Sequence, residues 1–253
     1  MSILALRTVT QRFGGLVAVK ELDFAIEQGS IVAMIGPNGA GKSTVFNLIT
    51  GIYKPSEGQI EFEGTPIQGR ATSAVAALGI ARTFQNIRLF AFMSALDNVM
   101  TGRHARMRAT LADALLRTPR AQKEENSVRQ RAHELLDFCG LSQYAETYAA
   151  NLPYGAQRRL EIARALASDP KLLLLDEPAA GMNPNEKAEL VTLIRRIRET
   201  GVTVFLIEHD MGLVMQISER IAVLDYGEKI AEGPPDAIRT NERVIEAYLG
   251  KPA

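Results

Sequence analysis

A phosphate-binding loop is indicated by nine consecutive residues, Gly36, Pro37, Asn38, Gly39, Ala40, Gly41, Lys42, Ser43 and Thr44. The loop follows an apolar run (31–35) and precedes a segment of helical character (45–50). In this setting glycines let backbone N–H groups crowd around phosphate oxygens, and the helix adds its positive dipole end. Lys42 is then placed to reach the β- and γ-phosphates of a nucleotide, and the Ser43 hydroxyl to coordinate Mg²⁺. The alternative is a glycine turn without function.

Two adjacent carboxylates, Asp176 and Glu177, end the apolar run 172–175, which is suited to a buried parallel strand. Carboxylates at the end of a buried strand are costly unless a cation lies opposite, and Mg²⁺ on a bound nucleotide is such a cation. We expect Asp176 to hold the ion through its water shell, and Glu177 to orient and deprotonate the attacking water. Capping of the next helix by both carboxylates is the alternative.

Two further polar residues follow strand patterns. His209 comes after the pattern at 204–207. A lone histidine at a strand end is usually structural, but together with a phosphate loop and a carboxylate pair it favours a γ-phosphate contact. Gln85 ends the strand-like run that starts at Ile80 and precedes an apolar loop, so its side chain could touch both a nucleotide and a neighbouring protein.

The N-terminal part of the chain predicts a small antiparallel sheet. Strand patterns at 3–13 and 22–26 flank a Gly-Gly turn, and a third pattern lies at 59–62. Phe13 lies 23 positions before Gly36, where an aromatic ring could stack on an adenine. Spacing alone favours a core aromatic at this position.

Residues 94–167 have helical character. Ser94 with Asp97 three places later resembles a capping box at the start of this insert. One apolar stripe at helical spacing consists of Val128, Ala132, Leu135, Leu136 and Cys139. From Arg103 to Arg131 there are eight Arg or Lys and three Asp or Glu, with Pro119 interrupting. This basic stretch is a surface for anionic lipid or a partner, or else a solvated helical face, which we favour.

The C-terminal part alternates strands and helices. A helix that closes at Gly201 is predicted by the i, i+3, i+4, i+7 pattern of Leu190, Leu193, Ile194 and Ile197. Strand patterns lie at 204–207, 220–224 and 229–232, and a terminal helix at 242–249. Together with the phosphate loop, this alternation indicates an α/β fold with a P-loop NTPase core.

Length and composition limit the remaining possibilities. The 253 residues can form one large core with a modest subdomain, and 29 Lys and Arg balance 29 Asp and Glu, so no global field attracts nucleic acid or anionic membranes. The single Cys139 excludes an internal disulfide, and its place on the apolar stripe favours core packing over a nucleophile. No apolar stretch approaches the ~20 residues of a membrane span and no signal-peptide pattern is present, so we expect a soluble chain.

Five motifs stand in a fixed order: the loop 36–44, Gln85, Leu152-Pro153-Tyr154-Gly155-Ala156-Gln157-Arg158-Arg159, the run 172–178 and His209. In this order they resemble the nucleotide-binding subunit of an ATP-binding cassette (ABC) transporter, over nearly the whole chain. Three segments and the long helical insert are similar to branched-chain amino acid importer ATPases: 83–90, 158–164 and 244–250. The resemblance implies an ATP-binding core at 1–87 and 168–253, with an antiparallel β subdomain, and an inserted α-helical signature subdomain at 88–167.

The resemblance also implies a head-to-tail dimer, in which ATP lies between the phosphate loop of one chain and the signature helix of the other. By this mapping Phe13 stacks on adenine, Gln85 senses Mg²⁺ and the transmembrane partner, and His209 contacts the γ-phosphate. The implied catalytic residues are Glu177, His209, Lys42 and Gln85. The implied metal-binding residues are Ser43, Gln85 and Asp176.

The partners implied are a second ABC ATPase subunit, identical or not, and integral-membrane permease subunits. A coupling helix of the permease would dock on the loop after Gln85 and on the neighbouring helical subdomain. A solute-binding protein would act indirectly, and no nucleic acid would be bound. The chain would lie peripherally on the cytoplasmic face of the inner (plasma) membrane.

The signature segment, which usually reads Leu-Ser-Gly-Gly-Gln, departs from the family pattern. Pro153 replaces the serine, Tyr154 the first glycine and Ala156 the glutamine, while Gly155 is kept and Gln157 follows. Loss of the serine removes a hydroxyl aimed at the neighbouring γ-phosphate. In the D-loop, Met182 and Asn183 stand where Leu and Asp are usual.

The sequence leaves three candidate functions for this chain. The leading interpretation is the energy-coupling ATPase of an amino acid importer. The alternative is a soluble ABC-type ATPase that acts on nucleic acid or ribosomes, although such relatives usually carry two cassettes or a long coiled-coil insert, which this sequence lacks. A small-molecule kinase that shares the phosphate loop would need a second substrate pocket, and the signature-like segment and the Asp176-Glu177 pair argue against it.

Overall fold

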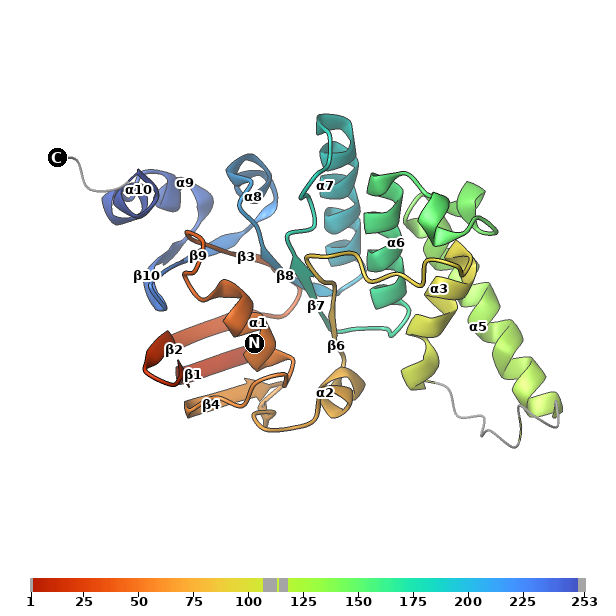
Figure 1. Cartoon of the computed structure of the whole chain (residues 1–253), viewed down its shortest axis with the longest axis horizontal. Coiled ribbons are helices and arrows are strands. Elements are labelled where there is room, and N and C mark those ends of the chain that lie inside the picture. The colour runs from red at the N-terminus through yellow and green to blue at the C-terminus, as the bar shows by residue number, and fades with distance from the viewer. Residues whose placement is uncertain (1, 107–112, 114–117, 250–253) are drawn as a thin grey trace.

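The computed structural model describes residues 2–106, 113 and 118–249 (Figure 1). Its strands are β1 (Ser2–Phe13), β2 (Leu16–Glu27), β3 (Ile31–Ile35), β4 (Glu57–Phe62), β5 (Thr65–Pro66), β6 (Ile80–Arg82), β7 (Leu172–Asp176), β8 (Thr203–Ile207), β9 (Arg220–Asp225) and β10 (Glu228–Gly233). Its α-helices are α1 (Lys42–Ile49), α2 (Thr72–Leu78), α3 (Ala95–Gly102), α5 (Pro119–Phe138), α6 (Tyr154–Leu166), α7 (Pro184–Glu199), α8 (Met211–Ile217), α9 (Pro235–Arg239) and α10 (Glu242–Leu249). Short 3₁₀ turns lie at His104–Arg106, Ser142–Tyr144 and Ala149–Asn151.

The central sheet brings the ends of its strands to one edge. Its order is β10-β9-β3-β8-β7-β6, and all pairs are parallel except β9 with β10. β3, β7 and β8 are buried along their whole length, as expected for apolar strands covered on both faces. The register pairs Ile207 with Met34 on one side and with Asp176 on the other. The phosphate loop, the carboxylate pair and the segment with His209 therefore all leave the sheet at its carboxyl edge.

A second, antiparallel sheet has the order β2-β1-β4-β5 and confirms the sheet expected from the N-terminal sequence (Figure 1). β2 begins at Leu16, earlier than the expected start at Leu22. Residues 16–21 have a weak alternation of their own, but they pair with β1 from the Phe13–Leu16 pair onward. Long-range pairing therefore defines this strand more than its local pattern does.

The helical insert is divided into α3, α5 and α6, which lie together at one end of the molecule (Figure 1). The Ser94 hydroxyl caps α3 by accepting a hydrogen bond from the Asp97 N–H at 3.0 Å, as the sequence pattern predicts. Pro119, which was expected to interrupt the insert, marks the start of a new helix. It lies in the first turn of α5, where its missing N–H costs no hydrogen bond. Part of the basic stretch, at 107–112 and 114–117, lies outside the described residues.

The apolar stripe of the insert is confirmed as core, because Val128, Ala132, Leu135, Leu136 and Cys139 are all buried. Burial raises the pKa of the Cys139 thiol to about 12. A thiol that stays protonated inside a core is not a nucleophile. Cys139 is therefore core packing, as predicted.

Helix α7 confirms the pattern that closes at Gly201, and it begins with a capping box between Asn183 and Glu186. Helices α2, α8 and α9 were not expected from the sequence, because each has only five to seven residues, too few for a periodic apolar pattern. The division into a core (1–87 and 168–253) and a signature subdomain (88–167) stays a prediction.

Candidate active site

The phosphate loop has two glycines at which a side chain has no room. A Cβ on Gly36 would lie 2.0 Å from the Leu224 carbonyl oxygen, and a Cβ on Gly41 would lie 2.4 Å from the Ala18 carbonyl oxygen. Gly41 has φ +102 and is the N-cap of α1, and no side chain of the described chain caps this helix end. The first N–H groups of α1 are therefore available to an anion.

Lys42 lies inside the loop. Its Nζ donates to the carbonyl oxygens of Gly36 at 2.7 Å and Pro37 at 2.9 Å, and only 9% of the residue is exposed. Burial lowers the pKa of Lys42, against the opposing effect of the charges on Glu177 and Asp176. A phosphate in the loop would offer this ammonium a charged acceptor in place of neutral carbonyls. Around it, Asn38, Gly39 and Ser43 are exposed, Pro37 and Thr44 half-buried, and Ala40 buried.

The carboxylate pair lies at the end of β7. Asp176 is buried, and its Oδ2 accepts a hydrogen bond from Arg82 Nη2 at 2.8 Å. Glu177 has φ +47, a left-handed conformation that is uncommon for a glutamate, and its N–H donates to the Ile207 carbonyl at 2.9 Å. The alternative in which the two carboxylates cap the next helix is wrong, because Asn183 caps α7.

Three predicted catalytic side chains meet at one oxygen. Gln85 Nε2 donates to Glu177 Oε2 at 3.0 Å, and His209 Nδ1 lies 3.6 Å from the same oxygen. The His209 side chain is 62% exposed, whereas the Glu177 side chain is 21% exposed. A partly shielded carboxylate that is held by an amide and has an imidazole beside it is an arrangement suited to a general base.

Phe13, at the end of β1, is 42% exposed, so the core-aromatic alternative is wrong. Its ring meets the ring of Tyr53 edge to face, with a centroid distance of 5.1 Å. An exposed ring supported by a second aromatic can stack on a flat ligand. The adenine contact of Phe13 stays a prediction.

Helix α6 begins with the signature segment. Pro153 is the exposed N-cap residue of this helix, and its side chain caps nothing in the described structure. The Tyr154 hydroxyl accepts hydrogen bonds from Arg158 Nε at 3.2 Å and Nη2 at 3.0 Å. A Cβ on Gly181 would lie 3.1 Å from the Tyr154 ring, so this ring packs directly on the segment after Glu177.

The rest of the segment is held by its own chain. A Cβ on Gly155 would lie 2.4 Å from Glu186 Oε1, so the glycine allows α6 to approach α7 closely. Ala156 is buried, and Gln157 Nε2 donates to the Leu152 carbonyl at 2.9 Å. Within the described residues, no hydrogen bond or ion pair joins 153–157 to the phosphate loop 36–44 of the same chain.

Three charged residues of the site were not found by sequence reasoning: Arg82, Arg158 and Glu208. Glu208 is 1% exposed, and its carboxylate accepts from the Ala179 N–H at 2.8 Å and the His209 N–H at 3.0 Å. It thereby ties the segment after the carboxylate pair to the segment with His209. The available signal was a charged residue at the end of an apolar strand, which holds for Arg82 and Glu208.

The predicted metal ligands are all oxygen donors, from Ser43, Asp176 and Gln85, and this set suits Mg²⁺. Among the residues described, no group of three or more His, Cys, Asp or Glu could hold a metal ion. Three oxygen ligands leave places for phosphate and water oxygens, so the predicted set fits an ion that arrives with a nucleotide.

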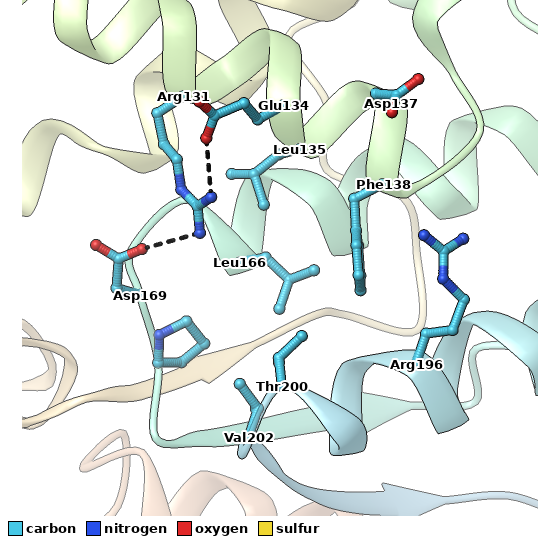
Figure 2. A pocket seen from close by; sticks show the side chains of 11 residues that line it. Arg131, Glu134, Leu135, Asp137, Phe138, Leu166, Asp169, Arg196, Thr200 and Val202 are labelled. Carbon is cyan, nitrogen blue, oxygen red and sulfur yellow. Dashed lines mark hydrogen bonds and ion pairs between the residues drawn. The ribbon is translucent and has the colours of Figure 1, made fainter.

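One hollow adjoins these contacts and another lies apart from them. A groove of about 800 Å³ runs between the core and the helical insert, and its lining includes Arg82, Phe84, Arg88, Phe90 and Arg164. A cavity of about 460 Å³ lies among α5, α6 and α7, where Arg131 reaches both Glu134 and Asp169 (Figure 2). Its described lining shares no residue with the predicted site.

A family model described as "ABC transporter" matches residues 19–180. The chain belongs to the ABC transporter family. This cassette is therefore an ATPase that binds nucleotide, and the fold is the ABC-type P-loop fold that the sequence predicts. A second model, described as "Branched-chain amino acid ATP-binding cassette transporter", matches residues 228–253.

Relatives of the cassette are described as high-affinity branched-chain amino acid transport ATP-binding proteins. BraF of Pseudomonas aeruginosa is 46% identical over 250 residues, and LivG of Salmonella typhimurium is 45% identical over 250 residues. In both comparisons 98% of each chain is covered. A probable LivG of Archaeoglobus fulgidus is 34% identical over 253 residues, with 99% of this chain and 96% of the relative covered.

Solved structures agree with this assignment. A nucleotide-free ATP-binding cassette from an ABC transporter has a TM-score of 0.87 and 30% identity, with 99% of this chain and 100% of that chain covered. A dimeric post-hydrolysis cassette with ADP and phosphate has a TM-score of 0.78 and 27% identity, with 92% and 98% covered. Neither the nucleic-acid alternative nor the kinase alternative receives support. None of the described helices has the length and apolar character of a membrane span.

Proposed function

We propose that this cassette is the ATP-hydrolysing, energy-coupling subunit of an importer for branched-chain or related amino acids. The hydrolytic part rests on one observation, the contact of Gln85 and His209 with the same oxygen of Glu177. The amino acid class rests on the printed descriptions of the relatives and on the family model at residues 228–253.

In this proposal the loop 36–44 holds the triphosphate, with Lys42 on the β- and γ-phosphates, while Phe13 stacks on the adenine. Ser43, Gln85 and Asp176 would hold Mg²⁺, which neutralises developing phosphate charge when it is bound.

Glu177 is the general base in this mechanism, and it takes a proton from the water that attacks the γ-phosphate. The Gln85 amide fixes the carboxylate of Glu177 by donating to Glu177 Oε2, which leaves Glu177 Oε1 for the water. His209, which is exposed beside it, would turn its second ring nitrogen to the γ-phosphate.

A second cassette would complete the site. Because residues 153–157 make no hydrogen bond or ion pair to the phosphate loop within the described part of their own chain, we assign them to the nucleotide of a partner cassette. The dimer solved for a relative with ADP and phosphate supports this assembly. The site on each chain would then close only when two chains meet around ATP.

The groove between core and insert would receive a permease. Phe90 lines this groove and is 52% exposed, and Phe92, on the same loop, is 90% exposed. A pair of exposed aromatics on one loop is typical of a partner surface. The partner would be a cytoplasmic helix of an integral-membrane subunit, and a solute-binding protein would deliver the amino acid to that subunit. The cassette would then lie peripherally on the cytoplasmic face of the membrane.

Purification and transport test this proposal. Isolated from membranes with its permease subunits and reconstituted in vesicles, the complex is expected to accumulate labelled leucine, isoleucine or valine only with ATP and Mg²⁺. Copurification with nucleic acid or ribosomes, and no membrane subunit, would contradict it. ATP hydrolysis with uptake of a chemically different solute would leave the ATPase assignment intact and overturn the amino acid class.

A further inference from the structure

Helix α6 holds the main chain of the loop 84–88 through charged side chains, which we call the α6 clamp: Arg158, Glu161 and Arg164. Arg158 Nη1 donates to the Phe84 carbonyl at 3.0 Å, and its Nη2 donates to the Gln85 carbonyl at 2.6 Å. Both accepting oxygens belong to the main chain, so the guanidinium fixes the position of the loop backbone and not only the conformation of one side chain.

The far end of the loop is held by the next two members of the clamp. Glu161 Oε1 accepts from the Arg88 N–H at 3.4 Å, and Arg164 Nη1 donates to the Arg88 carbonyl at 2.5 Å. The Arg158 and Glu161 side chains are 5% and 2% exposed, and Arg158 Nη1 lies 3.7 Å from Glu161 Oε2. Burial raises the pKa of Glu161, and the two arginines oppose this effect. These buried charged groups on α6 form hydrogen bonds with the main chain of the loop. A movement of α6 is therefore expected to move the loop as well.

The clamp connects two functional ends. On one side Gln85 donates to Glu177 Oε2 at 3.0 Å. On the other side Arg158 donates to the Tyr154 hydroxyl at 3.0 Å, and Tyr154 is the first residue of α6. A continuous set of contacts therefore runs from the signature segment, through Arg158, to the base of this chain's own site.

We propose that Arg158 is a positioning residue for ATP hydrolysis, which places the Gln85 amide on Glu177 according to the position of α6. The inference rests on the proposed function, in which Glu177 is the base and Tyr154 faces the nucleotide of the partner cassette. A shift of α6 would carry the carbonyls of Phe84 and Gln85 with it, and so would change the contact that orients Glu177.

A double-mutant cycle tests this role in the full chain. Arg158→Met is expected to lower ATP turnover by about 10- to 100-fold, as small misplacements of catalytic groups do, and to leave ATP affinity unchanged within about twofold. In a Gln85→Ala background the same substitution is expected to change turnover by less than about twofold, because its effect acts through Gln85. Arg158→Lys keeps the charge but cannot span both carbonyls, so an intermediate rate is expected.

Arg159→Met is the matched control. Arg159 is the next residue of α6, but it pairs with Glu189 of α7 and touches no part of the loop 84–88 among the described contacts. The ATP turnover of the Arg159→Met variant is expected to stay near that of the wild type.

Three results would overturn the proposal: additive effects of Arg158→Met and Gln85→Ala, an equal loss of turnover in Arg159→Met, or loss of ATP affinity in step with turnover. If Arg158→Met does not fold, the Arg158→Lys variant, which keeps the buried charge, carries the same cycle. Wild-type protein without ATP turnover would instead refute the proposed function.

Discussion

The side-chain amide of Gln85 donates to Oε2 of Glu177 over 3.0 Å, although the two residues are 92 positions apart in the chain. Gln85 stands just before the loop with Phe90 and Phe92, which are both exposed, and Phe90 lines the groove between core and insert. A partner bound to that loop can therefore act on the proposed base through a single side chain.

Lys42→Ala is expected to weaken ATP binding by at least ~10-fold, because the triphosphate loses a desolvated cation and its charge-assisted hydrogen bonds. Equilibrium titration with a fluorescent ATP analogue measures this. Lys20→Ala is the control, since the Lys20 side chain is exposed and pairs with the exposed Glu228. Wild-type affinity in Lys42→Ala would show that the loop 36–44 does not hold the nucleotide as proposed.

Glu177→Gln is expected to keep ATP binding and to slow hydrolysis by at least ~100-fold, the scale of losing a general base. ATP should then hold two cassettes together, because the bound ATP is no longer hydrolysed and the closed dimer persists. Single-turnover kinetics and gel filtration with ATP measure both effects. A monomer that turns over ATP at a near-normal rate would mean that Glu177 is not the base.

Substitutions in the loop 88–92, such as Phe92→Ala, are expected to abolish transport by the assembled complex and to leave the ATPase rate of the isolated cassette unchanged. The reason is that Phe92 is 90% exposed, so its ring buries little surface within the single chain. Parallel assays of uptake and of isolated ATPase compare the two. A proportional fall in both rates would assign this loop to the nucleotide site.

Pro153→Ser is expected to raise ATP hydrolysis by about ten- to a hundredfold at the site this residue faces, because a hydroxyl donor returns to the opposing γ-phosphate. Proline offers neither a side-chain donor nor a backbone N–H. Pro153→Ala separates this effect from loss of the ring, and it should not raise the rate. An unchanged or lower rate in Pro153→Ser would show that the proline only starts α6.

Cys139 is expected to resist alkylation in the folded protein and to react only on unfolding. Burial raises the pKa of this thiol to about 12, above its ordinary value of 9.0, so the reactive thiolate is absent near neutral pH. The stabilisation that comes from the buried neutral thiol is complete below pH 9 and is lost as the pH rises towards 12. Mass spectrometry after timed alkylation, with and without denaturant, measures this; rapid labelling at neutral pH without denaturant would contradict it.

Local sequence determined the parts of this protein whose chemistry is contained in a few adjacent residues. The phosphate loop could be predicted because its glycines, Lys42 and Ser43 lie within nine consecutive residues between a strand pattern and a helix pattern. The strand with Asp176 and helix α7 could be predicted because apolar periodicity is a local property.

Only the tertiary structure decided which distant groups meet. Helices α2, α8 and α9 are too short to show a period, and β2 extends to Leu16 because β1 lies beside it. The sequence places Arg158 in the signature segment, but only the fold brings its guanidinium to the carbonyls of Phe84 and Gln85, 74 and 73 positions away. Hydrogen bonds to backbone carbonyls leave no residue-type signal at the accepting position, so such contacts are visible only once the chain is folded.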